Sequence, residues 1–300
     1  MKYVISGIGG WLGHAAVHVL KHQRGVSSLD IIGIGREAGD IRIGEGDPIK
    51  VLSWAQASTM TTKSVTFLHF AFSTRDKINS LGMQEYVRSN REIIQNATGF
   101  ITAVKPIRVI LASSGAVYEK TGNQEFATDI VKNPYGVLKL EEELEVSQVC
   151  KSVGATCVIS RVWSLSGQDL QNTKPFVLAN FILDAMKYGQ ISIKSDFRVF
   201  RRYVDARELL LLMLTIAESK TSCNFDSGGP LVEIRDLAQE VAHQLPGEVK
   251  IVNPVLSETK SDDRYYSLSD TYEVLCQKYL GTNSLSLPQQ VQNTIAGLIT

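Results

Sequence analysis

Short hydrophobic runs alternate with longer segments of helical periodicity along the first half of the chain. The runs contain several β-branched residues and few charges, as is typical of strands buried on both faces of a parallel sheet. They span residues 2–6, 29–34, 65–71, 108–113 and 156–162, and helix-like segments lie at 12–24, 80–103 and 134–153. The alternation predicts right-handed strand–helix–strand crossovers, and therefore an α/β fold with a doubly wound parallel sheet.

The pattern is looser after about residue 165. It predicts helices over 174–188, 206–219 and 233–245 and a last short helix opened by Pro288, with short strands near 191–193, 202–204 and 223–225. No repeat or long linker separates the two halves. We therefore expect a first domain at 1–165, completed by about 206–230, and a smaller C-terminal α/β lobe made of 166–205 and 231–300.

Composition and charge exclude several classes of protein. The chain has 31 Lys and Arg and 31 Asp and Glu, whereas a nucleic-acid binder needs an excess of basic residues to neutralise phosphates. Residues 3–20 carry no formal charge, but glycines interrupt them, so we expect neither a membrane span nor a signal peptide. The four cysteines are scattered, which is typical of reduced thiols in a cytoplasmic protein.

A glycine-rich turn follows the first predicted strand at once. Gly7, Gly10 and Gly13, with Trp11 and Leu12 between the last two, form a G-x-x-G-x-x-G run that leads into a helix. Gly7 permits a tight turn, Gly10 leaves room for a pyrophosphate, and Gly13 permits close packing of helix on strand. Backbone N–H groups at the start of the helix favour anionic phosphates. The run therefore predicts a dinucleotide-binding loop.

The end of the second predicted strand indicates which dinucleotide binds. An acidic side chain there would accept a hydrogen bond from the 2′-hydroxyl of NAD(H), but the chain has Arg36. A guanidinium suits a 2′-phosphate, so we favour NADP(H) and keep NAD(H) as the alternative. In that alternative, Arg36 is a solvated turn residue that stacks on adenine.

A tyrosine and a lysine lie one turn apart in the third predicted helix. Tyr135 and Lys139 are spaced i and i+4, which places them on one helix face. A free tyrosine has a pKa of about 10, and a nearby ammonium would favour the phenolate, so Tyr135 is a candidate acid–base catalyst. Ser113 and Ser114 end the preceding strand, where open α/β sheets bind ligands, and either could polarise a reacting oxygen. The alternative is an ordinary surface Tyr–Lys pair.

Further motifs follow in order along nearly the whole chain. They are the Gly7/Gly10/Gly13 loop, His69-Phe-Ala71-Phe, Asn90, Ser113-Ser114-x-x-Val-Tyr118, Tyr135-x-x-x-Lys139, Arg161 through Gly167, Tyr203-Val-Asp205 and Asn224-Phe-Asp-Ser-Gly-Gly. Together they resemble an extended short-chain dehydrogenase/reductase of the NAD-dependent epimerase/dehydratase family, whose members act on nucleotide sugars.

The resemblance implies a Rossmann domain and roles for individual residues. It makes Ser114, Tyr135 and Lys139 the catalytic residues, with Ser114 also contacting substrate. It implies cofactor contacts at Gly7, Gly10, Trp11, Leu12, Gly13, Arg36, His69, Ala71, Asn90, Tyr135 and Lys139. It places Arg264 and either Arg202 or Arg201 at the substrate diphosphate, with rim ion pairs as the alternative. It also implies a homodimer formed through a helix bundle that includes 80–103 and 134–153.

Other positions depart from the family pattern or are given no role. Gly115 and Ala116 stand where dehydratases of the family have an Asp–Glu pair, so we discount dehydration. Phe72 stands where the family usually has alanine, which would alter packing beside the cofactor. We interpret Glu141–Glu143 with Glu145 as a solvated helix face. We predict no metal site, because His14, His18 and His22 have no carboxylate or cysteine at ligand spacing.

These expectations favour an NADP(H)-dependent oxidoreductase that reduces a keto-sugar nucleotide. The reason is that a reductase consumes NADPH, which suits Arg36, whereas an epimerase usually retains NAD. An epimerase with tightly bound NAD that uses the same Ser114, Tyr135 and Lys139 is the first alternative. A dinucleotide-sensing binding protein without catalysis is the second, because a fold alone does not establish an activity.

Overall fold

The computed structural model describes residues 1–119 and 125–299. The chain divides into two compact units, one formed by Met1–Arg161 and Leu210–Phe225 and the other by Val162–Leu209 and Asp226–Thr300.

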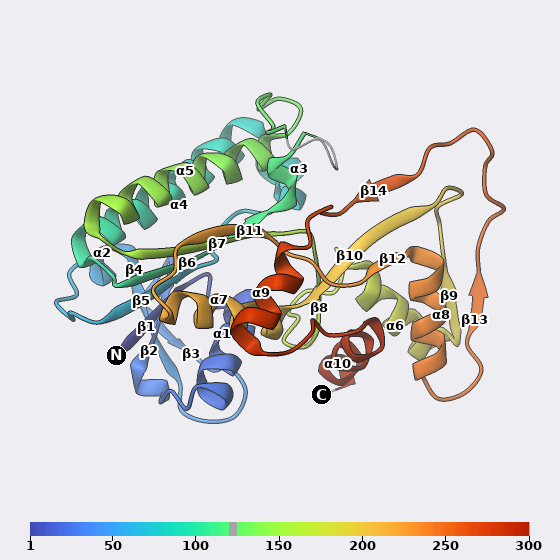
Figure 1. The fold of residues 1–300 in the computed structure, drawn as a ribbon, viewed down its shortest axis with the longest axis horizontal. Helices are drawn as coiled ribbons and strands as arrows, with labels where there is room; N and C mark the ends of the chain where they lie inside the picture. Colours follow the sequence, from blue (N-terminus) through green and yellow to red (C-terminus); the bar gives the residue numbers. More distant parts are fainter. Residues whose placement is uncertain (120–124, 300) are drawn as a thin grey trace. The chain divides into compact units, whose positions relative to one another are not determined.

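An eight-stranded sheet forms the centre of the first unit, in the order β11-β7-β6-β5-β1-β2-β4-β3 (Figure 1). The strands are β1 (Lys2–Ser6), β2 (Ile31–Gly35), β3 (Gly39–Ile41), β4 (Ile49–Ser53), β5 (Val65–His69), β6 (Arg108–Ser114), β7 (Thr156–Val162) and β11 (Cys223–Asp226). β1 pairs in parallel with β2 and β5, and β5 pairs in parallel with β6, whereas β3 runs antiparallel to β4 at the edge. The prediction of a doubly wound, mostly parallel sheet is confirmed.

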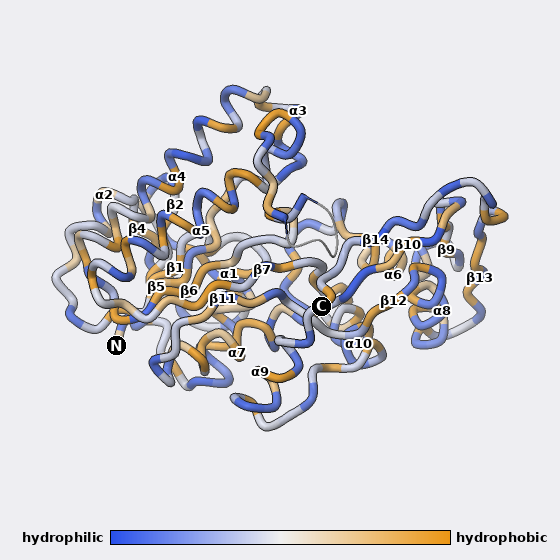
Figure 2. The backbone as a smooth tube through the Cα atoms, turned by 45° about the horizontal axis from the view of Figure 1, so that its top comes forward, coloured by the Kyte–Doolittle hydropathy of each residue, from blue (hydrophilic) through white to orange (hydrophobic). Residues whose placement is uncertain are grey.

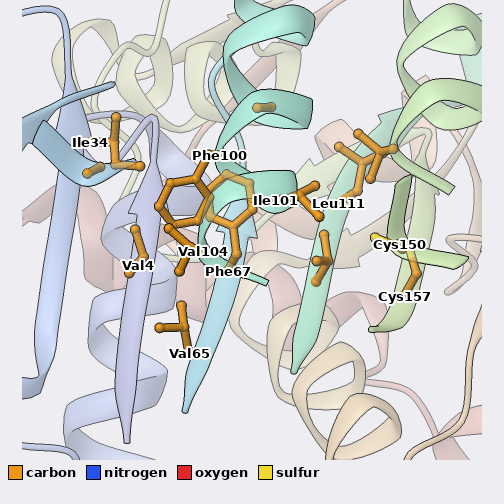
Figure 3. Packing of buried hydrophobic residues seen from close by; sticks show 14 of the residues in the cluster. Val4, Ile34, Val65, Phe67, Phe100, Ile101, Val104, Leu111, Cys150 and Cys157 are labelled. Atoms are coloured by element: carbon orange, nitrogen blue, oxygen red, sulfur yellow. The ribbon is translucent and has the colours of Figure 1, made fainter. Parts of the chain in front are cut away.

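Two long helices, α4 (Met83–Val104) and α5 (Pro134–Val153), run side by side over one face of this sheet (Figure 1). Between helices and sheet lies a hydrophobic core, in which the rings of Phe67 and Phe100 are 4.6 Å apart (Figure 3). Helix α1 (Trp11–His18) follows β1, and α2 (Trp54–Ala57) and α3 (Ile78–Leu81) are single turns. α7 (Ala206–Glu218) leads back to the sheet, and Arg24 holds its end through Glu218 at 3.1 Å.

Several boundaries differ from the sequence-based expectations. The helix expected at 12–24 is α-helical only to His18 and continues as a π-helical turn over Val19–Gln23. The helix expected at 80–103 is interrupted at Gly82, whose φ of 77° lies in the left-handed region that glycine adopts without strain. Strand β4 was not predicted, because exposed Lys50 interrupts its hydrophobic run near the edge of the sheet.

The second unit contains short strands and helices around its own core. The strands are β8 (Ser164–Ser166), β9 (Gln190–Ser192), β10 (Val199–Asp205), β12 (Leu231–Glu233), β13 (Lys250–Val252) and β14 (Asp263–Tyr265). The helices are α6 (Val177–Tyr188), α8 (Ile234–Gln244), α9 (Thr271–Leu280) and α10 (Leu287–Ile299). β10 lies between β12 and β14 and also pairs with β8, and β13 pairs with β9. Side chains from α6, α8 and α10 form most of the core.

Hydropathy follows the layers of the first unit. Figure 2 shows the central strands as largely hydrophobic, whereas α4 and α5 alternate between hydrophobic and hydrophilic residues. Within the described ranges, no helix has both the length and the hydrophobicity to cross a membrane. The same residues include no group of three or more His, Cys, Asp or Glu side chains placed to hold a metal ion.

Candidate active site

The turn between β1 and α1 has the geometry of a phosphate-binding loop. Gly7 has a φ of 71°, and a Cβ there would lie 2.7 Å from the backbone N of Ala71, so only glycine fits without displacing the chain after β5. A Cβ on Gly13 would overlap the carbonyl oxygens of Gly7 and Ile8. Two of the three glycines are therefore required by close backbone packing.

The third glycine faces open space. Gly10 is exposed, and a Cβ there would meet only the Gly7 carbonyl oxygen, at 3.4 Å. No side chain caps the N-terminus of α1, which begins at Trp11 directly after Gly10. The open glycine and the uncapped N–H groups fit the pyrophosphate of a dinucleotide. Leu12 is half-buried and Trp11 is buried, so their side chains support the helix.

Arg36 follows the end of β2 and is exposed. Among the described residues, the structure records no hydrogen bond or ion pair for its guanidinium. The side chain is therefore available to a phosphate or an adenine ring from solvent.

The start of α5 is clamped against the end of β6. Asn133 accepts a hydrogen bond from the Gly136 N–H at 2.9 Å and donates one to the Ala116 carbonyl at 2.9 Å. Pro134 occupies the first turn, where its missing N–H costs nothing. A Cβ on Gly136 would overlap the Ala116 carbonyl, so the helix approaches the β6 turn as closely as a glycine permits. This clamp places Tyr135 beside Ser114.

Ser114, not Ser113, lies with Tyr135. Ser114 Oγ accepts from the Ala116 N–H at 3.2 Å, and the Ser114 side chain lies close enough to the Tyr135 phenol to lower its pKa. Successive side chains of a strand point to opposite faces, so Ser113 lies on the other side of β6. There its buried Oγ has no hydrogen-bond partner among the described residues. Ser114 is therefore the serine that lies near Tyr135.

Tyr135 is held in its protonated form. Desolvation raises the pKa of its phenol to about 12, the hydrogen bond with Ser114 opposes this rise, and the Glu142 carboxylate adds to it. That the Lys139 ammonium favours the phenolate stays a prediction. In the structure this ammonium is paired with the Glu142 carboxylate.

Lys139 is buried, with 4% of its surface exposed. Its Nζ donates to Glu142 Oε2 at 2.8 Å and to the Ala112 carbonyl at 3.0 Å. The ring centroid of Phe72 lies 3.9 Å from the same Nζ, and this ring also packs edge-on against Tyr135, with 5.7 Å between centroids. The two hydrogen bonds and the ring contact account for all three N–H groups of the ammonium.

Glu142 is completely buried between Lys139 and His69. Glu142 Oε1 lies 3.1 Å from His69 Nε2, and His69 Nδ1 lies 2.5 Å from the hydroxyl of Ser6, the residue before Gly7. Burial alone would raise the pKa of Glu142, but the Lys139 ammonium and His69 outweigh it and hold the pKa below its usual value. The side chain of His69 therefore lies within a buried polar chain and stacks on Phe67.

Asn90 holds the segment after β5. Its side chain accepts from the Ser73 N–H at 2.8 Å and donates to the carbonyls of Ser73 and Tyr86. Tyr86 donates its hydroxyl hydrogen to the same Ser73 carbonyl at 2.9 Å. Asn90 thus acts on the backbone that carries Ala71 and Phe72.

A model of the NAD dependent epimerase/dehydratase family matches residues 3–225, which include the glycine turn, Ser114, Tyr135 and Lys139. The chain belongs to this family. The resemblance to an extended short-chain dehydrogenase/reductase is thereby confirmed, as is the expectation of an enzyme. No curated protein matches the sequence.

Solved structures share the fold of this family member over its whole length. A UDP-N-acetylglucosamine 4-epimerase from Methanobrevibacter ruminantium, in complex with UDP-N-acetylmuramic acid, has a TM-score of 0.78 at 17% identity and covers 99% of this chain and 98% of its own. A UDP-glucose 4-epimerase from Thermus thermophilus, in complex with NAD, has a TM-score of 0.76 at 15% identity, with coverages of 100% and 99%. TunA, an NAD-dependent NDP-hexosamine 5,6-dehydratase, has a TM-score of 0.74 at 14% identity, with coverages of 100% and 98%.

We expected Glu141–Glu143 and Glu145 to form a solvated helix face. In this epimerase/dehydratase family member that is wrong for two of the four, whereas Glu145 is exposed. Glu142 and Glu143 are both buried, and Glu143 forms a paired salt bridge with Arg161, with 2.7 Å between Oε2 and Nη2. Arg161 also donates to the Tyr118 hydroxyl at 2.6 Å. Glu142 is the functional candidate that our sequence analysis missed.

The two arginines assigned to substrate lie in the second unit. Arg202 is on β10 and Arg264 on β14, and the pairing of Phe200 with Arg264 puts them on one face of this small sheet. Arg202 donates to the Ser269 carbonyl at 2.9 Å, and Arg264 pairs with Asp262 at 3.0 Å while remaining largely exposed. Arg264 can therefore leave its ion pair and bind an anion more readily than Arg202 can.

Proposed function

We propose that this chain is an NADP(H)-dependent oxidoreductase that reduces a keto group of a nucleotide-diphosphate sugar. The supporting observation is that Tyr135 remains a phenol beside Ser114, because burial and Glu142 raise its pKa to about 12. Reduction of a carbonyl needs a proton donor at this place, whereas oxidation of a hydroxyl needs a base. The nucleotide-sugar class follows from the family and from the UDP-sugar named for one structural relative.

The residues at the carboxyl ends of β1 and β2 suit the cofactor. The open turn at Gly10 and the start of α1 would hold the pyrophosphate, and exposed Arg36 would hold a 2′-phosphate. The reduced nicotinamide supplies a hydride when the cofactor is bound. Lys139 is occupied by Glu142, the Ala112 carbonyl and Phe72, so we assign its ammonium to Glu142 and not to a ribose hydroxyl.

The protein supplies the proton and orients the substrate oxygen. The Ser114 and Tyr135 hydroxyls would donate hydrogen bonds to the carbonyl oxygen and polarise it. As the carbonyl carbon accepts a hydride, Tyr135 gives its O–H proton to the oxygen, so that the C=O becomes an H–C–O–H group. Tyr135 is left as a phenolate and regains its proton from water.

A substrate panel tests this function. We expect purified protein to oxidise NADPH stoichiometrically with at least one keto-sugar nucleotide, followed by absorbance and by mass spectrometry of the product. Tyr135→Phe should lower turnover by about 100-fold or more while the Kd for NADPH changes by less than about twofold. The matched control is Tyr188→Phe, a tyrosine that is 65% exposed. Absence of NADPH oxidation across the panel contradicts the proposal.

An epimerase is the second candidate, and the family supports it equally. Several similar structures are those of nucleotide-sugar 4-epimerases. Protein that purifies with bound NAD and interconverts two sugar nucleotides without net redox change would establish this alternative.

We also propose a homodimer formed through α4 and α5. The outer surface of α4 has a groove of about 720 Å³ that includes exposed Met83 with Val87 and Arg91. Exposed apolar side chains on a long helix are typical of an interface. Light scattering should give about twice the chain mass, and Met83→Glu with Val87→Glu should give the monomer.

A reducing compartment such as the cytoplasm suits the thiols. In the structure none of the four cysteines, all within the described residues, forms a disulfide, and three of them are buried. Disulfides are rare in the cytoplasm and common in secreted proteins. Thiol counting on protein purified without reductant should give four.

A further inference from the structure

A buried chain of four polar side chains joins the glycine turn to the catalytic helix. Ser6 on β1, His69 on β5, and Glu142 and Lys139 on α5 are each at most 4% exposed. Their contacts run from Ser6 to His69 at 2.5 Å, from His69 to Glu142 at 3.1 Å and from Glu142 to Lys139 at 2.8 Å. Replacing a buried ion pair with apolar residues is often neutral or stabilising, so stability alone does not account for this pair.

The Lys139–Glu142 ion pair affects the electrostatic environment of Tyr135. Ser114 from β6, Tyr86 from α4 and Glu142 from its own helix act on Tyr135, and Lys139 lies one turn further along that helix. Phe72 lies against both Tyr135 and Lys139 and contributes only an apolar ring. An unpaired ammonium one turn from a phenol would favour the phenolate, but here a carboxylate cancels the charge.

We propose that Glu142 is a positioning residue of this enzyme: it fixes and neutralises the Lys139 ammonium against the Ala112 carbonyl, so that Tyr135 works as a proton donor. The His69 ring, whose Nδ1 contacts Ser6, lies 3.1 Å from the other oxygen of the Glu142 carboxylate. The inference rests on the proposed reduction.

Titration of Tyr135 tests the inference without substrate or cofactor. The ten tyrosines are labelled with ¹³C at Cζ, and the Tyr135 signal is assigned by its loss in Tyr135→Phe. In the wild type we expect no Tyr135 phenolate up to pH ~11, beyond the usual pKa of about 10. In Glu142→Gln the midpoint should fall by about one pH unit or more, because the ammonium is no longer neutralised. Circular dichroism at each pH confirms that the protein is folded.

Glu143→Gln is the matched control, because Glu143 is a buried, salt-bridged glutamate of the same helix that pairs with Arg161. It should leave the Tyr135 midpoint unmoved. An unchanged midpoint in Glu142→Gln, or an equal fall in both variants, overturns the inference. If Glu142→Gln does not fold, His69→Gln is titrated instead, since it keeps Glu142 but removes its orienting partner. A smaller fall is then expected, and an unchanged midpoint again overturns the inference.

The titration tests the role of Glu142, and the substrate panel tests the proposed function, so either can be rejected without the other. A lowered midpoint in a protein that reduces no keto sugar would reject the proposed function and leave the role of Glu142 in place. An active reductase in which Glu142→Gln leaves the Tyr135 midpoint unchanged would support the proposed function and reject the role of Glu142. With an active enzyme, Glu142→Gln should also move the alkaline limb of the pH–rate profile of reduction to lower pH, because Tyr135 loses its proton earlier.

Discussion

The ring of Phe72 lies over the ammonium of Lys139, with 3.9 Å between the ring centroid and Nζ. A cation over an aromatic face is attracted by the ring quadrupole, so Phe72 occupies the one N–H direction that Glu142 and the Ala112 carbonyl leave. Phe72, which we predicted would alter packing beside the cofactor, thus covers the ammonium of Lys139.

Phe72→Ala should therefore strengthen cofactor binding. Removing the ring exposes an N–H of Lys139 to a ribose hydroxyl, and one charge-assisted hydrogen bond corresponds to about a tenfold lower Kd for NADP(H). Isothermal titration calorimetry measures it. Phe126→Ala is the control, because Phe126 is 43% exposed and stacks on Tyr118 instead. A Kd that rises in Phe72→Ala would show that the ring supports the cofactor.

Arg36→Ala should weaken NADPH binding by about tenfold or more and leave NADH binding nearly unchanged, because only NADPH carries the 2′-phosphate. Dissociation constants for both cofactors measure the difference. Arg42→Ala is the control, since Arg42 is a nearby arginine that donates to the Gly46 carbonyl. Equal loss of affinity for the two cofactors would indicate stacking on adenine and reject the NADP(H) preference.

Two glycines with positive φ separate the cost of backbone strain from the cost of steric overlap. Gly7 and Gly25 both have positive φ, at 71° and 63°, but a Cβ on Gly25 meets nothing within 4 Å, whereas one on Gly7 would overlap the backbone of Phe70 and Ala71. Gly25→Ala should lower the free energy of unfolding by about 1 kcal/mol, the cost of the left-handed conformation. Gly7→Ala should cost at least about 2 kcal/mol more, because backbone must shift. Equal losses in urea denaturation would contradict this geometry.

Local sequence predicts the parts of the site that depend on local chemistry. The turn at Gly7 and the start of α5 at Asn133 and Pro134 follow from backbone freedom and capping, which neighbouring residues determine. Helix α5 has the predicted bounds of 134–153. The helices α6, α7, α8 and α10 also lie where the sequence pattern predicts them. By contrast, β4 and the short strands β8, β12, β13 and β14 were not predicted, since short strands depend on their partners.

The role of Glu142 was missed although its signal is in the sequence. Glu142 and Glu143 follow Leu138 and precede Val146 and Cys150 at spacings of three and four, so they lie on the buried stripe of α5. Composition alone suggested a solvated run of glutamates. Their partners His69 and Arg161 come from distant strands, and only the fold brings them together.

Stability at acid pH should depend on Glu142. Its pKa is lowered in the folded protein, because the Lys139 ammonium and His69 outweigh the cost of burial, so its ionised form stabilises the fold. This stabilisation is complete above the pKa of the unfolded chain, about 4.3, and is lost as the pH falls through the lower pKa of Glu142 in the folded protein.

Glu142→Gln removes this stabilisation and leaves the buried ammonium unpaired, which should lower the free energy of unfolding by about 3 kcal/mol at neutral pH. The difference in the free energy of unfolding between wild type and variant should become smaller below pH ~4, because the wild-type carboxylate then takes up a proton. Urea denaturation from neutral to acid pH measures this difference, and exposed Glu145→Gln should change stability at neutral pH by less than about 0.5 kcal/mol. A difference that stays constant throughout would mean that the ionised carboxylate contributes nothing to the fold.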